Sequence, residues 1–276
     1  MTLKQAYDYG VYFLSANGVD EAEFKSLCLV CHLDGIKNSE FEFHKNDEII
    51  MKKFADLLWR VKSGEPLQYV IGKWDFYESE FFLGEGVLIP RPETEELTDL
   101  AVKFAQKIEN PVVIDLCSGS GCIGISIAKK VKASTVYLVE KSEKAFSYLL
   151  KNAKDVPNVN SLNKDIFALP QIEKADIIVS NPPYINSDDI DLLQKEVKRE
   201  PRMALDGGQD GLDFYRFIAE NYKNYLKDGG TLLFEIGETQ ADAVADILKS
   251  NGYSDIEIKN DIYGNARIAV CRKKMR

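Results

Sequence analysis

From residue 91 to the end of the chain, strand-like and helix-like segments alternate, and this alternation limits the possible folds more than any other feature. Seven short runs have the apolar, β-branched composition of strands: VVIDL, TVYLVE, a weaker VNSLN, ADIIV, TLLFEI, DIEIK and RIAVC. Helical patterns separate most of these runs. The alternation predicts an α/β domain in which a mostly parallel sheet is covered by helices on both faces.

The first 64 residues have another pattern, which predicts a small helical bundle. Three helices are expected, at 2–18, 20–35 and 46–64, and each begins at a capping-type residue and stops at a glycine. Glu23, three residues after Asp20, predicts a capping box for the second helix. The later run WDFYESEFFLGEGVLIP is aromatic and interrupted by glycines, as a hairpin is. We therefore expect a helical domain at 1–72, a β-hairpin connector at 73–90 and the α/β domain at 91–276.

Charge and composition argue against several classes of protein. The net charge of −9 does not suit a surface that holds nucleic acid through its phosphates. No stretch approaches ~18 uninterrupted apolar residues, and the first residues lack the order of a signal peptide. The odd number of cysteines, five, suits a reducing compartment. We expect a cytoplasmic monomer that contacts no membrane and binds no nucleic acid directly.

Metal and haem sites are not expected either. The run CLVCH has the spacing of a haem attachment motif, but it lies in a helical pattern in which Cys28 and Cys31 share one face. Buried cysteines act as small apolar side chains, and we expect that structural role here. The whole chain has two histidines, too few for a histidine-rich metal site.

The run VVIDLCSGSGCIGISIA, residues 112–128, combines a strand, a glycine-containing turn and the start of a helix. Glycines let the backbone approach a ligand, and the helix start offers free N–H groups. Gly119, Gly121 and Gly124 also satisfy the G-x-G-x-x-G pattern of dinucleotide sites. Glu140 ends the next strand, 25 positions after Asp115, where a carboxylate accepts hydrogen bonds from ribose hydroxyls. The set fits any nucleoside cofactor, and a turn that serves only packing is the weaker alternative.

The run NPPY, residues 181–184, follows a strand directly. Its two prolines end the strand because neither has an N–H to donate. Asn181 therefore lies at the carboxyl end of the strand, where open α/β sheets bind ligands. The Asn181 side chain and the Pro182 carbonyl are two acceptors, and Tyr184 offers a flat surface. Two acceptors suit a planar NH2 group facing a methyl donor at the glycine turn; a rigid loop without a catalytic role is the alternative.

DLCSGSG together with NPPY resembles the class I methyltransferases, which use S-adenosylmethionine and act on planar nitrogen. NPPY alone does not choose among N6-adenine DNA, N2-guanine RNA and protein-glutamine methylases. The runs EPLQYVIGKWDFY, VLIPRPETEEL, ALDGGQDGLDFYR and LFEIGETQ resemble the PrmC/HemK family, which methylates the glutamine of the GGQ motif in peptide-chain release factors. The resemblance implies a Rossmann-like, seven-stranded methyltransferase domain and a helical domain that docks the release factor.

The resemblance also assigns roles to residues of this chain. Those assigned to S-adenosylmethionine are Cys117, Ser118, Gly119, Ser120 and Gly121 beside the methionine part, Glu140 on the ribose, and Asp165 and Ile166 beside the adenine. Those assigned to the substrate amide are Asn181, Pro182, Pro183 and Tyr184, with Asn181 also near the cofactor. Those that cover the site from the connector are Arg91, Glu93 and Thr94. No metal is implied.

Two positions depart from the family pattern. Cys117 stands where the family often has glycine, and Ile166 stands where it often has tryptophan, so Ile166 cannot stack on adenine as an aromatic ring does. The chain's own GGQ, residues 207–209, is expected to be a loop and not a substrate mimic.

Three alternative functions stay open. They are an N6-adenine or N2-guanine nucleic-acid methyltransferase, a ribosomal-protein glutamine methyltransferase, and a non-catalytic nucleotide-binding protein.

Overall fold

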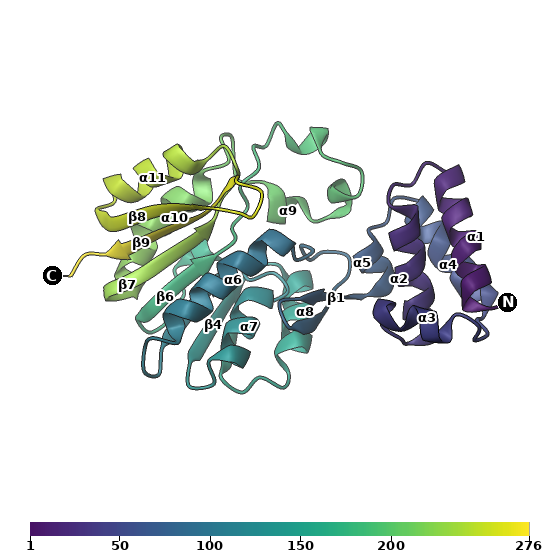
Figure 1. Ribbon diagram of the computed structural model, residues 1–276. Helices are drawn as coiled ribbons and strands as arrows, with labels where there is room; N and C mark the ends of the chain where they lie inside the picture. The colour runs from purple at the N-terminus through teal and green to yellow at the C-terminus, as the bar shows by residue number, and fades with distance from the viewer. Residues whose placement is uncertain (276) are drawn as a thin grey trace. The chain divides into compact units, whose positions relative to one another are not determined.

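The computed structural model describes residues 1–275, which form two compact units (Figure 1). One unit comprises Met1–Lys73 and Gln194–Arg199, and the other comprises the rest of the described chain. Within residues 1–275, no helix combines the length and the apolar character that a membrane crossing requires.

Five α-helices and one 3-10 helix make up the first 73 residues. They are α1 Leu3–Ala16, α2 Ala22–Asp34, η1 Asn38–Glu40, α3 Phe41–His44, α4 Met51–Lys62 and α5 Leu67–Ile71. The capping role of Thr2 is confirmed, because its hydroxyl accepts from the Gln5 N–H and the Gln5 side chain accepts from the Thr2 N–H. Gly35 ends α2 in the left-handed conformation, as expected.

Two expected helix starts are wrong. Glu21 has a φ of 54°, so the chain turns left-handed there, α2 begins at Ala22, and no side chain caps it. The expected capping box of Asp20 and Glu23 therefore does not form. The helix expected from residue 46 begins at Met51, after residues that pair with the first turn of α1 through the hydrogen bond from the Leu3 N–H to the Asp47 carbonyl.

The short segment Gln194–Arg199 joins the helical unit although it lies far along the chain. The Lys25 Nζ atom, on a side chain that is 7% exposed, lies 2.7 Å from Glu196 Oε1. Arg199 donates to the carbonyl of Ser63. A buried lysine needs such a partner, because an unpaired ammonium in the interior is costly. The sequence pattern does not indicate this return of the chain.

All seven expected strands are present in one sheet. They are β3 Val112–Leu116, β4 Thr135–Glu140, β5 Val159–Asn163, β6 Ala175–Ser180, β7 Leu226–Glu235, β8 Tyr253–Asn260 and β9 Ala266–Lys273. Their order is β5-β4-β3-β6-β7-β9-β8, and all pairs are parallel except the two that involve β9. The chain leaves β3 for β4 on one side and later for β6 on the other, so the carboxyl end of β3 is a topological switch point.

Helices cover both faces of this sheet, as the alternating pattern predicts. One face packs on α6 Pro92–Ala105, α7 Cys122–Lys130 and α8 Glu143–Ala153, and Figure 1 shows α6 and α7 in front of the strands. The other face packs on α10 Asp213–Asn221 and α11 Ala241–Ser250. Successive residues of β3 alternate between these two cores, with Val113 in the first and Val112 and Ile114 in the second.

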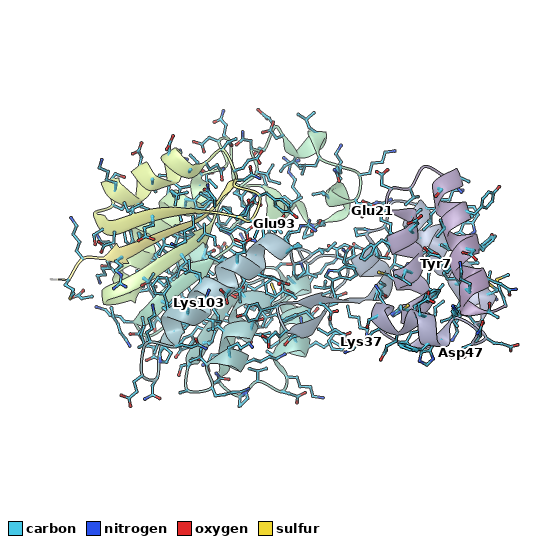
Figure 2. The ribbon with its side chains drawn as sticks, in the orientation of Figure 1. Tyr7, Glu21, Lys37, Asp47, Glu93 and Lys103 are labelled. Carbon is cyan, nitrogen blue, oxygen red and sulfur yellow. The ribbon has the colours of Figure 1, made fainter. Side chains whose placement is uncertain are left out.

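Helix α6 has favourable charges at its two ends. Figure 2 shows Glu93 and Lys103 toward opposite ends of this helix, in its first and last turns. A carboxylate near the N-terminus and an ammonium near the C-terminus interact well with the helix dipole. Pro92 at the first helical position fixes the start, so that Thr94, two residues later, is held in the first turn and buried.

The hairpin that was expected over 73–90 is shorter in the structure. Its strands are β1 Lys73–Phe76 and β2 Ser79–Phe82. Phe76 and Phe81 are buried with their ring centroids 6.0 Å apart and join the core beneath α7. The following residues run without regular structure to α6, because Gly84 and Gly86 interrupt the apolar pattern.

Candidate active site

One cavity lies at the carboxyl ends of β3, β4 and β6, with an empty volume of about 970 Å³ that includes open solvent at its mouth. Most of the residues assigned to the cofactor line it; they are Cys117, Ser118, Gly119, Ser120, Glu140, Asp165, Ile166 and Asn181. Gly121 is not among the lining residues.

The turn after β3 needs backbone conformations that favour glycine. Gly119 and Gly121 have φ of 55° and 81°, and Cys117 has a φ of 59°, so a residue with a side chain occupies a left-handed position there. Glycine at position 117 would relieve that strain. Gly124 serves packing instead, because a Cβ atom there would lie 2.1 Å from the Leu138 side chain.

Asp115, which lies in β3 just before the glycine turn, is behind the wall of the cavity. Its side chain is fully buried, one oxygen accepts from the Gly124 N–H at 3.0 Å, and burial raises its pKa to about 8. It is not among the cavity-lining residues. Its carboxyl group therefore supports the turn and does not face a ligand.

Glu140 is held rigidly at the end of β4. Its two carboxylate oxygens accept from the Gly119 N–H at 2.8 Å and from the Ser142 N–H at 2.6 Å. Burial raises the pKa of Glu140, and the two backbone N–H groups oppose that rise. Each oxygen keeps a free lone pair, so the group can accept hydrogen bonds from two neighbouring hydroxyls.

An aromatic wall stands beside Ile166 that the sequence analysis missed. Asp165 caps the 3-10 helix η2 Ile166–Ala168 by accepting from the Phe167 N–H, and Lys141 lies 2.7 Å from its other oxygen. Phe167 lines the cavity with 44% of its surface exposed, and its ring lies 5.3 Å from that of Phe214, which also lines the cavity. The signal in the sequence is an aromatic residue directly after Asp165 and Ile166, the two positions expected beside the adenine.

The NPPY loop brings Asn181 and Pro183 to the cavity, while Pro182 and Tyr184 are not among the lining residues. The Asn181 Nδ2 atom donates to Thr94 Oγ1 at 3.2 Å. The Tyr184 hydroxyl lies 3.5 Å from a Glu235 carboxylate oxygen, and burial raises the pKa of Tyr184. Glu235 is a site residue that the sequence analysis did not single out; it lies at the end of β7.

Two runs from later in the sequence, ALDGGQDGLDFYR and LFEIGETQ, fix the shape of the NPPY loop. The Gly207 N–H donates to the Ile185 carbonyl at 2.8 Å, and a Cβ atom at Gly207 would lie 2.7 Å from the Tyr184 Cα atom. Gln240 donates to the Tyr184 carbonyl at 2.9 Å. The chain's own GGQ is therefore a loop, as expected, and it packs against NPPY.

The end of the connector and the start of α6 supply another wall of the cavity. Leu88, Ile89, Arg91 and Thr94 line it, whereas Glu93 does not. Arg91 pairs with the buried Glu200, which also accepts from the Ile89 N–H at 3.0 Å. This double attachment holds the connector beside the cavity, and the covering role of Arg91, Glu93 and Thr94 stays a prediction.

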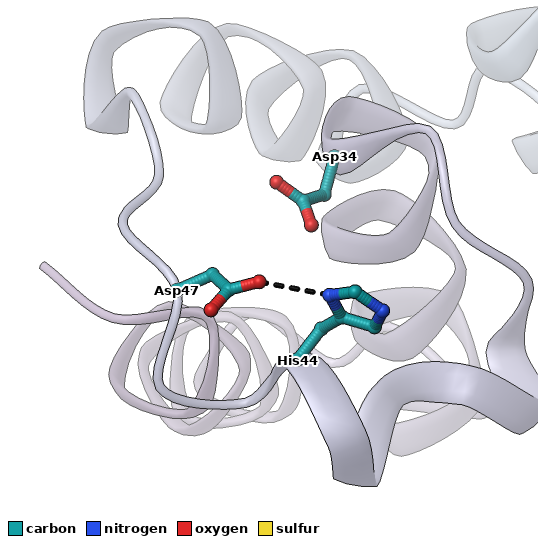
Figure 3. Close-up of side chains that lie close together, drawn as sticks. All are labelled: Asp34, His44 and Asp47. Carbon is teal, nitrogen blue, oxygen red and sulfur yellow. Dashed lines mark hydrogen bonds and ion pairs between the residues drawn. The ribbon is translucent and has the colours of Figure 1, made fainter.

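The described residues contain one group that could hold a metal ion, and it lies in the helical unit. Asp34, His44 and Asp47 place their ligand atoms within 4.8 Å of one another (Figure 3). His44 Nδ1 lies 2.8 Å from Asp47 Oδ2. That hydrogen bond accounts for the contact between His44 and Asp47 without an ion, and none of the three residues lines the cavity.

Comparison with protein families gives two matches along the chain. A PrmC N-terminal domain matches residues 5–72, and a methyltransferase small domain matches residues 95–209. Three release factor glutamine methyltransferases are similar over most of their length. That of Thermodesulfovibrio yellowstonii is 39% identical over 89% of this chain and 90% of the relative. Those of Fusobacterium nucleatum and Geobacter sulfurreducens are 36% and 34% identical, over 98% and 97% of this chain and 78% and 95% of the relatives.

A solved structure supports the fold. The 16S rRNA methyltransferase RsmC of T. thermophilus, in complex with AdoMet and guanosine, has a TM-score of 0.52 and 16% identity. The match covers 73% of this chain and 50% of that one. At this identity the likeness shows the shared methyltransferase fold and nothing of the substrate.

Proposed function

The chain belongs to the family of release factor glutamine methyltransferases, and we propose that the cavity described above carries out the reaction of that family. The chain transfers a methyl group from S-adenosylmethionine to the side-chain amide nitrogen of a glutamine in peptide-chain release factors. We assign that glutamine to the GGQ motif. The observation that carries the assignment of the site is that Asn181 shares one cavity with Glu140 and the glycine turn.

We assign the cofactor to the side of the cavity formed by β3 and β4. Glu140 has free lone pairs for both ribose hydroxyls, since backbone N–H groups hold its two oxygens in place. Phe167 and Ile166 provide the apolar surface for the adenine, so Phe167 supplies aromatic contact where Ile166 cannot. Space around Gly119 is open, which lets a methionine group lie against the backbone.

We assign the substrate amide to the side of the cavity at Asn181. Bound S-adenosylmethionine supplies an electrophilic methyl group whose bonding electron pair stays on sulfur. An amide nitrogen is a poor nucleophile because its lone pair is delocalised into the carbonyl. Asn181 Oδ1 accepts one amide hydrogen and aims the nitrogen, and the other hydrogen is assigned to the carbonyl of the adjacent Pro182, which itself is not among the lining residues. These hydrogen bonds strengthen as positive charge develops on nitrogen, and the methylated nitrogen then loses one proton to water.

We also propose that residues 1–72 dock the release factor and take no part in the chemistry. Every residue that lines the cavity belongs to the other unit, and the PrmC N-terminal domain covers residues 5–72. A GGQ tripeptide offers little surface for recognition, because a stable protein interface buries about 1,200–2,000 Å². A second surface supplies the missing area.

Transfer of labelled methyl from S-adenosylmethionine tests this function. Release factor, its Gln→Ala variant at the GGQ motif, ribosomal RNA, DNA and ribosomal protein are offered in parallel. We expect label on intact release factor only, with the methyl group on the GGQ glutamine by mass spectrometry. Equal labelling of the Gln→Ala variant, or label on nucleic acid alone, would refute the assignment.

A further inference from the structure

Glu235 is a buried carboxylate that lies directly behind the substrate side of the cavity. Its side chain is at the end of β7, the residue is 2% exposed, and it is not among the cavity-lining residues. Glu235 Oε2 accepts a hydrogen bond of 2.6 Å from Thr94 Oγ1. The same Thr94 oxygen accepts from Asn181 Nδ2 at 3.2 Å. These contacts form a relay from β7 through α6 to the NPPY loop.

The chemistry of the three groups gives this relay a direction. An ionised carboxylate can only accept hydrogen bonds, so the Thr94 hydroxyl must donate its single hydrogen to Glu235. The Thr94 oxygen then has only lone pairs left for Asn181, and it can pair with the Nδ2 end of that amide but not with the Oδ1 end. Asn181 Oδ1 is therefore left to accept from a ligand.

We propose that Glu235 is a positioning residue, which acts through the Thr94 hydroxyl to set the amide orientation of Asn181 that methyl transfer requires. The proposal rests on the proposed function, in which Asn181 Oδ1 accepts a hydrogen of the substrate amide. The opposite orientation of the Asn181 amide, which the relay disfavours, presents N–H groups to the NH2 of the substrate. That orientation offers no acceptor and does not bind the amide productively.

The charge state of Glu235 makes the relay sensitive to pH. Burial raises the pKa of Glu235 to about 7, and Glu93 adds to the rise, against the hydrogen bond from Thr94, the charge of Arg267 and a weaker hydrogen bond from Asn181. The groups that face it come from α6, the NPPY loop and β9; they are Glu93, Thr94, Asn181, Tyr184 and Arg267. A protonated Glu235 donates to Thr94, whose hydroxyl is then free to donate to Asn181 Oδ1. Acid therefore reverses the relay and turns the amide of Asn181 around.

Kinetics of four variants test the relay with S-adenosylmethionine and release factor both saturating, between pH 5.5 and 9. Thr94→Val removes the relay hydroxyl and keeps the shape, and Thr94→Ser restores the hydroxyl. Glu235→Gln cannot titrate. Thr98→Val is the matched control, because Thr98 is a fully buried threonine one turn along α6 whose hydroxyl donates to the backbone carbonyl of Thr94 and not to the relay hydroxyl. Calorimetry gives the affinity for S-adenosylmethionine in each case.

We expect the kcat of the wild type to fall up to tenfold per pH unit below about 7. Thr94→Val should lose about tenfold or more in kcat at pH 8, the factor expected for one hydrogen bond, with cofactor affinity kept within about twofold. Thr94→Ser should recover kcat to within about threefold, and Thr98→Val should keep the wild-type profile. Glu235→Gln should lose the acid fall in kcat.

Two results would overturn the relay. One is a Thr94→Val protein with wild-type kcat at pH 8, and the other is a Glu235→Gln protein with the acid fall of the wild type. If Thr94→Val does not fold, the profile of Glu235→Gln decides alone. A wild-type chain that leaves release factor unmethylated at every pH would instead refute the proposed function, and the relay with it.

Discussion

Replacing Glu235 by glutamine should make the protein increasingly stable relative to the wild type as pH rises from 4.5 to 7, although it removes a negative charge beside Arg267. The pKa of Glu235 rises from 4.5 to about 7 through burial, so the folded protein holds a proton that the unfolded chain has released between these two values. Stability from this group is therefore full below pH 4.5 and is lost as pH rises to 7. At 1.36 kcal/mol per pH unit, the loss is on the order of 3 kcal/mol.

Glutamine is nearly the same size and keeps an acceptor for Thr94, but it has no proton to lose. The free energy of unfolding of Glu235→Gln minus that of the wild type should therefore increase by up to about 3 kcal/mol from pH 4.5 to 7 and stay constant above that. Urea denaturation of both proteins at pH 5, 6, 7 and 8 measures this difference in the free energy of unfolding. Asp115, whose pKa is about 8, titrates in both proteins and cancels in the difference.

A difference in unfolding free energy that is flat from pH 5 to 8 would refute this reasoning. It would mean that Glu235 ionises in the folded protein as it does in the unfolded chain. In that case Arg267 and Thr94 compensate the burial of the carboxylate fully, and the acid fall in kcat expected from the relay has no source in Glu235.

Three further predictions concern the cofactor and the helical domain. Glu140→Ala should weaken S-adenosylmethionine binding at least tenfold by calorimetry, because the ribose hydroxyls lose their acceptors; unchanged affinity contradicts the assignment. Phe167→Ala should weaken the same binding about three- to tenfold through lost apolar contact, whereas Phe24→Ala, an exposed phenylalanine in the helical unit, should leave it unchanged. Removal of residues 1–72 should lower kcat/KM at least a hundredfold on intact release factor and much less on a GGQ peptide, provided that circular dichroism shows a folded chain; equal losses would mean that these residues only support the fold.

All seven strands of the sheet could be predicted from the sequence, although β7 begins at Leu226, five residues before the expected run TLLFEI. Runs such as VVIDL are buried on both faces, and all five of their residues are buried in β3, so composition alone marks them. Helix starts were less predictable. Asp20 and Glu23 have the types and spacing of a capping box, but the left-handed φ of Glu21 moves the start of α2 to Ala22. The backbone conformation of Glu21 therefore decides where α2 begins, and the side-chain pattern of a capping box does not.

The site was predictable where its residues follow strands and unpredictable where contacts are distant. Glu140 and Asn181 end strands, so their place at one edge of the sheet follows from the α/β pattern. The bond between Thr94 and Glu235 joins residues 141 positions apart, and no local pattern indicates it. The return of Gln194–Arg199 to the helical unit also depends on contacts between residues that are far apart in the sequence.

The rate of a single turnover in Asn181→Ala tests the central claim most directly, which is that Asn181 orients the substrate amide. Enzyme in excess over release factor, with saturating S-adenosylmethionine, isolates the transfer step from product release. We predict a fall in rate of at least a hundredfold and little change in the unfolding midpoint, because Asn181 lies in a loop at a strand end and contributes little to the core. Turnover at the wild-type rate would contradict the account.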